Sequence, residues 1–113
     1  MLKINQEMQV RKRDGRTLTF DRELIARAIR KAFRADLGLD QLDQIDADKL
    51  SDIESITENV VRSVKQQADT EAGVDVEEIQ DNVEQELMRA EYFSVARRYI
   101  IYRAERNRMR KLR

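Results

Sequence analysis

Four basic side chains lie within six positions near the N-terminus, and they surround an Asp-Gly pair. A helix-like sequence follows directly behind them, from Arg22 onward. The first turn of a helix offers unpaired backbone N–H groups and a partial positive charge, which favour a bound anion. A triphosphate requires several such donors together with positive side chains. This stretch therefore predicts an anion site, with Lys12, Arg13 and Arg16 as its charged side chains.

A purine base would need an apolar slot with polar groups at its edge. Val10, Phe20 and Ile25 are the candidates to flank a base, and the Asp21 carboxylate is the candidate acceptor for an exocyclic amine. The sequence contains neither a Walker loop nor a G-x-G-x-x-G motif, so charge and periodicity alone do not identify the ligand. A basic hairpin on a solvated surface is the competing interpretation of the same residues.

A β-hairpin is expected to hold these residues in place. Apolar residues alternate on both sides of the turn, as on the half-buried face of a strand pair. A two-residue turn would place Val10 and Leu18 on opposite faces, whereas a three-residue loop over 13–15, with Gly15 left-handed, places them on one face. We therefore predict the longer loop. It pairs Lys12 with Arg16, Val10 with Leu18, and Met8 with Phe20.

The remaining sequence predicts four helices, because apolar residues recur there at a period of 3.6. They are expected over Arg22 to about Ala35, from Lys49 or Asp52 to the region 69–73, from Val76 to a bend at 90–93, and from a cap at Ser94 onward. Asp21 is the expected N-cap of the first helix, and residues 51–54 and 75–78 read as capping boxes. The connection over 36–48 is acidic, with a short helical turn near 39–45.

The side chains predicted to face the core follow one stripe on each helix. In the first two helices they are Leu24, Ile25, Ala28, Ile29, Ala32, Phe33, Ile53, Ile56, Val60, Val61, Val64 and Ala68. In the last two helices they are Val76, Ile79, Val83, Leu87, Val95, Ala96, Tyr99, Ile100 and Tyr102.

The composition favours a single α-rich domain and excludes several kinds of chemistry. Of 113 residues, 39% are charged and 5% aromatic, with three Gly and no Pro, so long uninterrupted helices are expected. Without Cys or His, the sequence offers no disulfide, no thiolate or imidazole metal ligand, and no Ser-His or Cys-His nucleophile. No apolar run reaches the length of a membrane span or of a signal-peptide core. We therefore expect a soluble cytoplasmic protein.

The net charge of zero conceals a strong segregation of charge along the chain. Residues 1–35 carry 10 basic and 4 acidic side chains, residues 36–91 carry 4 and 17, and residues 92–113 carry 8 and 1. The corresponding charges are +6, −13 and +7. The two basic ends either share one site or form separate binding surfaces.

Three sequence blocks, in this order, resemble an ATP-cone, the regulatory nucleotide-binding domain found mainly at the N-terminus of ribonucleotide reductase large subunits. The blocks are VRKRDGRTLTF with D-x-x-L-I-A-R-A-I-x-K-A-F, then VEEIQDNVE, then VARRYIIYR. The resemblance covers about residues 8 to 108. It implies a mainly α fold of four helices capped by a small N-terminal β-hairpin, and allosteric control by ATP and dATP with Mg²⁺.

The resemblance also implies roles for residues at matched positions. Val10, Lys12 and Arg13 match the nucleotide-contacting V-x-K-R positions, and Phe20, Asp21 and Ile25 match positions around the base. Arg103 or Arg106 matches the phosphate-binding group on the last helix.

This sequence departs from the family pattern at two places. Family members often carry Lys where this chain has Leu24, and Arg22 is the candidate substitute. Some members carry Thr and His where this chain has Val76 and Gln80. Gln80 can still form hydrogen bonds to a nucleotide, whereas Val76 cannot. These departures imply a weaker site, a different pose, or a different nucleotide stoichiometry, since some cones hold two nucleotides.

By this resemblance, residues 1–113 form one regulatory domain that is not itself an enzyme. The basic tail at about 104–113 is expected to lead to a catalytic or radical-subunit region. ATP would favour the active assembly of the reductase and dATP the inhibited one, through contacts with other reductase subunits or self-association. The sequence leaves open whether the parent is a large or a small subunit and whether one or two nucleotides bind.

The sequence is also compatible with two other classes of function. A nucleic-acid binder would use Arg97, Arg98 and the basic tail, but the acidic middle of the chain would repel a duplex. A helical interaction module would use Met88, Tyr92 or Phe93 at the last bend, alone or under nucleotide control. An enzyme is disfavoured, because no carboxylate pair is set apart by an apolar environment.

Overall fold

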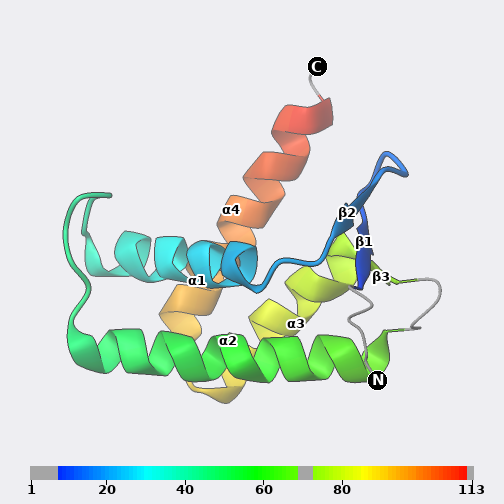
Figure 1. Cartoon of the computed structure of the whole chain (residues 1–113). Coiled ribbons are helices and arrows are strands. Elements are labelled where there is room, and N and C mark those ends of the chain that lie inside the picture. Colours follow the sequence, from blue (N-terminus) through cyan, green and yellow to red (C-terminus); the bar gives the residue numbers. More distant parts are fainter. Residues whose placement is uncertain (1–7, 69–72, 112–113) are drawn as a thin grey trace.

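The computed structural model describes residues 8–68 and 73–111, which form four helices and a small sheet (Figure 1). The elements in chain order are β1 (Gln9–Arg11), β2 (Thr17–Thr19), α1 (Arg22–Leu37), α2 (Ala47–Gln67), β3 (Val74–Asp75), α3 (Val76–Arg89) and α4 (Phe93–Lys111). The predicted mainly α fold with a small N-terminal hairpin is confirmed. Within the described residues, none of the helices is both long enough and apolar enough to cross a membrane.

The hairpin has the predicted register. Val10 lies opposite Leu18, and the Lys12 N–H donates to the Arg16 carbonyl at 2.8 Å. Gly15 has a φ of 89°, which is the left-handed conformation that a three-residue loop requires at this position. Lys12 and Arg16 therefore lie at the two ends of the loop, and Arg13 lies within it.

The third strand was not predicted from the sequence. β3 pairs in parallel with β1, so that Val10 lies opposite Val74 and the sheet order is β2-β1-β3. Gly73 precedes this strand with a φ of 82°, and a Cβ at this position would lie 2.4 Å from the Gln9 carbonyl oxygen. Only glycine permits this close approach of the two backbones.

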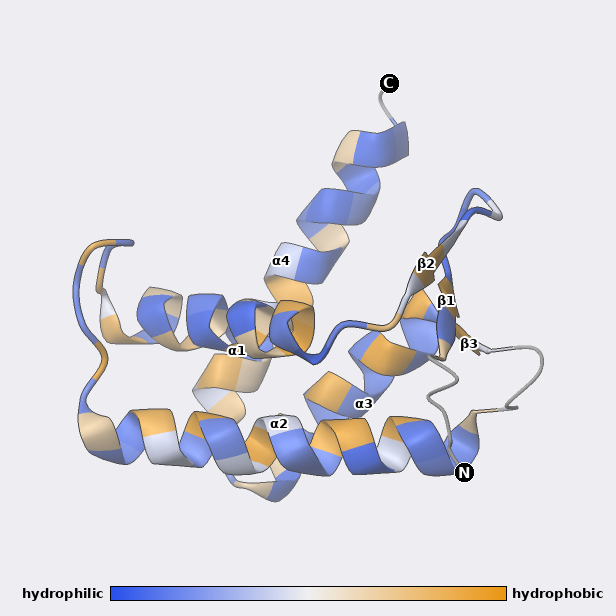
Figure 2. Ribbon diagram, viewed as in Figure 1, coloured by the Kyte–Doolittle hydropathy of each residue, from blue (hydrophilic) through white to orange (hydrophobic). Residues whose placement is uncertain are grey.

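The helices bury the predicted apolar stripes with two exceptions, Leu24 and Ile100. α1 and α2 run back along each other, and Figure 2 shows hydrophobic residues recurring along α2 and a mostly hydrophilic outer half of α4. Phe33, Ile29, Leu87, Val60 and Val64 are among the largest fully buried side chains. Leu24, in the first turn of α1, was predicted to be buried but is 50% exposed. Ile100 was also predicted to be buried but is 38% exposed, because α4 turns the side of Val95, Ala96 and Tyr99 toward the core.

Helix starts were predicted correctly for α1 and α3. Asp21 caps α1 by accepting from the Glu23 N–H at 3.0 Å. The capping box of α3 is present, since the Glu78 carboxylate accepts from the Asp75 N–H at 3.2 Å. These signals are local in sequence, so they do not depend on how the helices pack.

Helix starts were wrong for α2 and α4. α2 begins at Ala47, so that Ser51 and Glu54 lie inside the helix rather than at its start. α4 begins at Phe93, and the Ser94 hydroxyl donates to the Asp36 carboxylate at 2.9 Å instead of capping the helix. In addition, α1 continues to Leu37. The stretch 39–45 forms no helix but holds one hydrogen-bonded turn, in which the Asp43 N–H donates to the Asp40 carbonyl at 3.3 Å. The predicted end of α2, at 69–73, falls mainly on residues 69–72, which lie outside the described residues.

Candidate functional site

A mainly apolar pocket of about 250 Å³ lies between the hairpin and the first turns of α1 and α3. Six of the predicted site residues line it, from the hairpin and its ends and from both helices. These are Val10, Lys12, Phe20, Asp21, Ile25 and Gln80. Leu24, Ala28, Val76, Ile79, Val83 and Tyr99 complete most of its wall. The volume is below the range of about 300–1,000 Å³ for a drug-sized ligand, so the pocket suits one ring system rather than a whole nucleotide.

A second hollow of about 350 Å³ opens between α1 and α4. Its cationic side chains are Arg27, Lys31, Arg103, Arg106 and Arg110, and its described lining contains no carboxylate. Leu24, Ala28, Val76, Gln80 and Tyr99 line both this hollow and the apolar pocket. The two spaces are therefore adjacent, with a ring-sized slot on one side and a concentration of positive charge on the other.

A third hollow of about 400 Å³ lies between the hairpin tip and the outer end of α4. Lys12, Arg13, Arg16, Arg110 and Lys111 supply its positive charge, with Asp14 as the one carboxylate in its described lining. Asp14 is already paired with the Arg16 guanidinium at 2.7 Å, and its hydrogen bond from the Arg16 N–H holds its pKa below the usual range. This hollow meets the apolar pocket at Lys12 and the α1–α4 hollow at Arg110. The two basic ends of the chain therefore face one another here.

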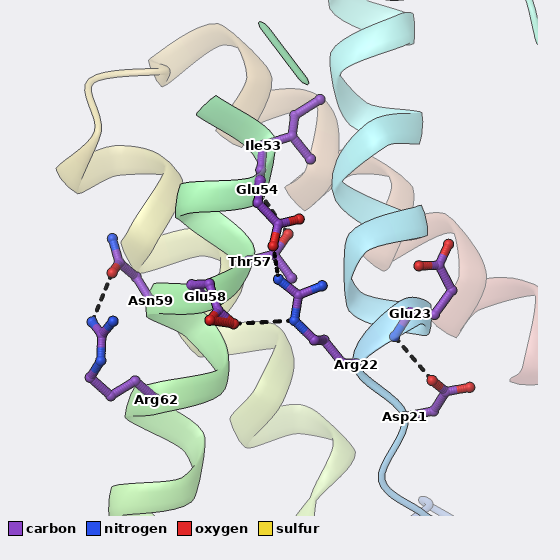
Figure 3. Close-up of polar contacts among 9 residues, drawn as sticks. All are labelled: Asp21, Arg22, Glu23, Ile53, Glu54, Thr57, Glu58, Asn59 and Arg62. Carbon is purple, nitrogen blue, oxygen red and sulfur yellow. Dashed lines mark hydrogen bonds and ion pairs between the residues drawn. The ribbon is translucent and has the colours of Figure 1, made fainter. Parts of the chain in front are cut away.

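Arg22 lies outside all three hollows. Its guanidinium reaches across to α2, where Nε lies 3.2 Å from Glu58 Oε1 and a second nitrogen pairs with Glu54 (Figure 3). Asp21, one residue earlier, points back to the start of α1. Arg22, the candidate substitute for the family lysine, thus links α1 to α2 through ion pairs with two carboxylates of α2.

Arg103 and Arg106 have different surroundings on α4. The Arg103 guanidinium donates to Asp81 at 2.8 Å and to Glu84 at 2.7 Å, and 16% of its side chain is exposed. Burial acts to lower the pKa of Arg103, but these hydrogen bonds outweigh burial and raise it. Arg106 instead donates to the Tyr102 hydroxyl at 3.1 Å and forms no ion pair with a described residue. Arg106 is therefore the freer cation of the two.

The hairpin is held against α3 by two ion pairs. Arg11 Nε lies 2.8 Å from Asp75, and Arg13 lies 3.1 Å from Glu77. Half of the Glu77 side chain is exposed, so its attraction for Arg13 is screened by water. Because this ion pair is screened, a phosphate group can compete with Glu77 for Arg13. Arg13 also lines the hairpin-tip hollow.

Gln80 stands at the boundary between the apolar pocket and the α1–α4 hollow. Its carbonyl oxygen Oε1 is buried and has no hydrogen-bond partner among the described residues. Such an oxygen accepts hydrogen bonds and requires a donor. In the described part of the chain, no group of three or more acidic residues could hold a metal ion.

Several lining residues were missed by the sequence analysis. Arg27 and Lys31 were not among the predicted site residues, and the residues of α4 beyond Arg106 were assigned to a tail, yet they line the basic hollows. One signal could have found them. Arg27 and Lys31 are four residues apart, as are Arg106 and Arg110, so each helix presents a pair of like charges on one face.

Comparison with known proteins shows which family the chain belongs to. The model of the ATP cone domain family matches residues 8–108, and the chain therefore belongs to the ATP-cone family. The chain is 40% identical to the ribonucleoside-diphosphate reductase subunit alpha of Chlamydia pneumoniae over 99 residues, which is 88% of this chain and 9% of that protein. The subunit alpha of Chlamydia trachomatis is 41% identical over 88% of this chain and 10% of that protein.

A more distant relative is the anaerobic ribonucleoside-triphosphate reductase of Salmonella typhimurium. It is 37% identical over 98 residues, which cover 87% of this chain and 12% of that protein. The chain thus spans about a tenth of the length of the relatives it matches.

Proposed function

We propose that this chain is a regulatory domain that binds ATP and dATP and controls the overall activity of a ribonucleotide reductase. The observation that carries the proposal is the direct contact between a ring-sized apolar pocket and two hollows dense in positive charge. Family membership and the reductase relatives support the same ligand and the same parent enzyme.

The adenine ring would occupy the apolar pocket between Phe20 and Ile25. Asp21 uses one carboxylate oxygen to cap α1 and has a second oxygen to accept from the exocyclic amine of adenine. Guanine carries a carbonyl at the corresponding position, which a carboxylate would repel. Asp21 therefore supports a preference for adenine over guanine.

The triphosphate would lie among the cations, with Lys12 and Arg106 as the principal contacts. Lys12 lies where the apolar pocket meets the hairpin-tip hollow, and Arg106 lines the α1–α4 hollow. Arg103 would contribute mainly by holding α4 against α3, since two carboxylates already occupy its guanidinium. Mg²⁺ would enter with the nucleotide, because phosphates and water commonly supply its ligands.

Regulation requires that ATP and dATP stabilise different states of the parent enzyme, because a ligand with equal affinity for two states shifts nothing. We propose that the two states differ in subunit assembly. Dissociation or self-association of reductase subunits would then be the output of the domain.

Calorimetric titration with ATP and then dATP in the presence of Mg²⁺, with the mass measured at each endpoint, tests the proposal. We expect both nucleotides to bind and the stoichiometry or the mass to differ for dATP. An Arg97→Ala variant is the control for nonspecific charge effects and should bind both nucleotides as the wild type does. Arg97 is an exposed cation of α4 outside the three hollows. Absence of heat and of a thermal shift with either nucleotide would refute nucleotide binding. Binding without any change in mass would refute the assembly mechanism alone.

A further inference from the structure

The side of α4 that faces away from the core exposes large apolar side chains. Phe93, Ile101 and Met109 are 64%, 47% and 58% exposed. Arg97 and Glu105 lie midway between them, so that five exposed side chains follow one another at a spacing of four residues. Side chains at this spacing form one ridge on the surface of a helix. We call these five residues the α4 ridge.

The α4 ridge is separate from the candidate nucleotide site. None of its five side chains lines the apolar pocket or either of the basic hollows. Figure 1 shows the outer half of α4 extending beyond α1. A nucleotide and a second protein can therefore occupy the two places at the same time, and changes in the ridge leave the nucleotide site intact.

The ridge is complementary to a second copy of itself that runs in the opposite direction. In chain order its side chains are apolar, basic, apolar, acidic and apolar. With Ile101 of one copy against Ile101 of the second copy, Arg97 lies opposite Glu105, because both are four residues from Ile101. Phe93 and Met109, eight residues from Ile101 on either side, then also lie opposite each other. An antiparallel pair thus places every charge opposite its counterion and every apolar side chain opposite another.

The single acidic residue of this segment supports a second copy as the partner. Residues 92–113 carry 8 basic side chains and one acidic side chain, which is Glu105 on the ridge. Neither Arg97 nor Glu105 forms an ion pair with another described residue. A uniformly acidic partner would repel Glu105, whereas an antiparallel copy supplies a counterion to both residues.

We propose that two copies of this chain associate through the α4 ridge, with their last helices antiparallel and Ile101 at the two-fold axis. The inference rests on the proposed function for its regulatory role, since it assigns a surface to the self-association of the domain. Ridges of this spacing pack against each other at a crossing angle of about 50° between the helix axes. We expect a single helix pair to bury less than the roughly 1,000 Å² of a stable interface, so the association is weak and reversible.

A cysteine cross-link tests the alignment of the two helices. The chain contains no Cys, so Ile101→Cys introduces a single thiol. At the two-fold axis two such thiols come within reach of a disulfide, which requires Cα atoms about 4.4–6.8 Å apart. Leu50→Cys on α2, where the native side chain is 43% exposed, is the control. With oxidised glutathione as the oxidant, we expect Ile101→Cys to form a covalent dimer and Leu50→Cys to remain mostly monomeric.

Charge reversal tests the pairing of Arg97 with Glu105. Arg97→Glu alone or Glu105→Arg alone places like charges opposite each other at both charged contacts of the dimer. Each should weaken self-association about tenfold or more, measured by sedimentation equilibrium, because both ion pairs are replaced by repulsion. A mixture of the two variants restores both opposite-charge contacts and should associate as the wild-type chain does. Thermal denaturation checks that each variant is folded.

Equal cross-linking of the two cysteine variants would overturn the inference. So would association at wild-type strength in both charge variants, or a mixture that associates no more strongly than either variant alone. A wild-type chain that stays monomeric at every concentration, with and without nucleotide, would overturn it as well. If dATP changed the mass of Arg97→Glu and Glu105→Arg as it changes that of the wild type, the proposed function would stand and the ridge would be excluded. Association through the ridge without binding of either nucleotide would instead refute the proposed function alone.

Discussion

Arg103 on α4 donates to Glu84 on α3 across 2.7 Å, while Arg106, one turn further along α4, pairs with no described carboxylate. The sequence left open which of the two arginines would contact phosphate, and their surroundings differ. Arg103 is largely buried and holds two helices together. Arg106 faces a hollow whose described lining contains no carboxylate.

Arg106→Ala is therefore expected to weaken triphosphate binding about tenfold, as for loss of one charged hydrogen bond, with little change in thermal stability. Arg103→Ala should instead lower the free energy of unfolding by about 1–2 kcal/mol, because it leaves Glu84 and Asp81 without their partner. Thermal denaturation and calorimetry of both variants check the assignment. If Arg103→Ala abolished binding while leaving the stability unchanged, the roles would be reversed.

Lys12→Ala is expected to weaken ATP by about tenfold or more and adenosine by much less, because the ammonium group acts on the phosphates. Lys65→Ala is the control, since Lys65 is an exposed lysine of α2 that lines none of the three hollows. Competition titrations with both ligands measure the two losses. Equal losses for ATP and adenosine would show that Lys12 does not contact phosphate.

Asp21→Ser is expected to reduce the preference for ATP over GTP while keeping α1 capped. Ser is about as good an N-cap as Asp, whereas Ala costs about 1 kcal/mol at this position. The comparison of Asp21→Ser with Asp21→Ala thus separates capping from base recognition. Affinities for ATP and GTP, together with melting temperatures, provide the measurement. An unchanged ATP-to-GTP ratio in both variants would leave recognition of the base to backbone groups.

Gly73→Ala is expected to cost clearly more stability than Gly15→Ala. Both glycines have positive φ, and an alanine in that conformation costs about 1–2 kcal/mol. A Cβ at Gly15 meets no atom within 4 Å, whereas one at Gly73 lies 2.4 Å from the Gln9 carbonyl oxygen. Urea denaturation of the two variants isolates the cost of that clash. Equal destabilisation would mean that β1 and β3 separate easily.

Tyr92→Phe is expected to destabilise the fold by about 1 kcal/mol near neutral pH, through loss of the hydrogen bond from its hydroxyl to Asp52. That bond raises the pKa of Tyr92 from 10.0 to about 12. Because the folded-state pKa is the higher one, the stabilisation is complete below pH 10 and is lost as the pH rises toward 12. The stability difference between wild type and variant should therefore shrink above pH 10. A difference that stayed constant with pH would exclude ionisation of this hydroxyl.

Two features that depend on local sequence were predicted correctly. The loop around Gly15 and the capping box of Asp75 and Glu78 each involve residues a few positions apart. β3 was not predicted, because two residues carry no periodicity and the strand exists only through pairing with β1, 64 positions earlier. The predicted start of α2 was wrong because several closely spaced Asp and Ser residues offer equally good caps.

The residues that line the apolar pocket were predicted better than the ion pairs around it. The sequence identified the residues around the apolar pocket, since they follow from the hairpin register and the start of α1. It did not separate Arg22 from the other cations, because the carboxylates that hold Arg22 lie 32 and 36 positions away on α2. Side chains of the same charge acquire different roles only when the packed helices place different ion-pair partners beside them.

Lys12 and Arg110 come from opposite ends of the chain, and each lines the hairpin-tip hollow. This hollow does not exist until the last helix has docked beside the first hairpin, so an anion bound there recognises only the completed fold. Binding to the folded state alone adds about 2.7 kcal/mol of stability at a ligand concentration one hundred times the dissociation constant. The concentration of such a ligand in the cell would then set how long the finished domain survives before it unfolds, and with it how much of the domain accumulates.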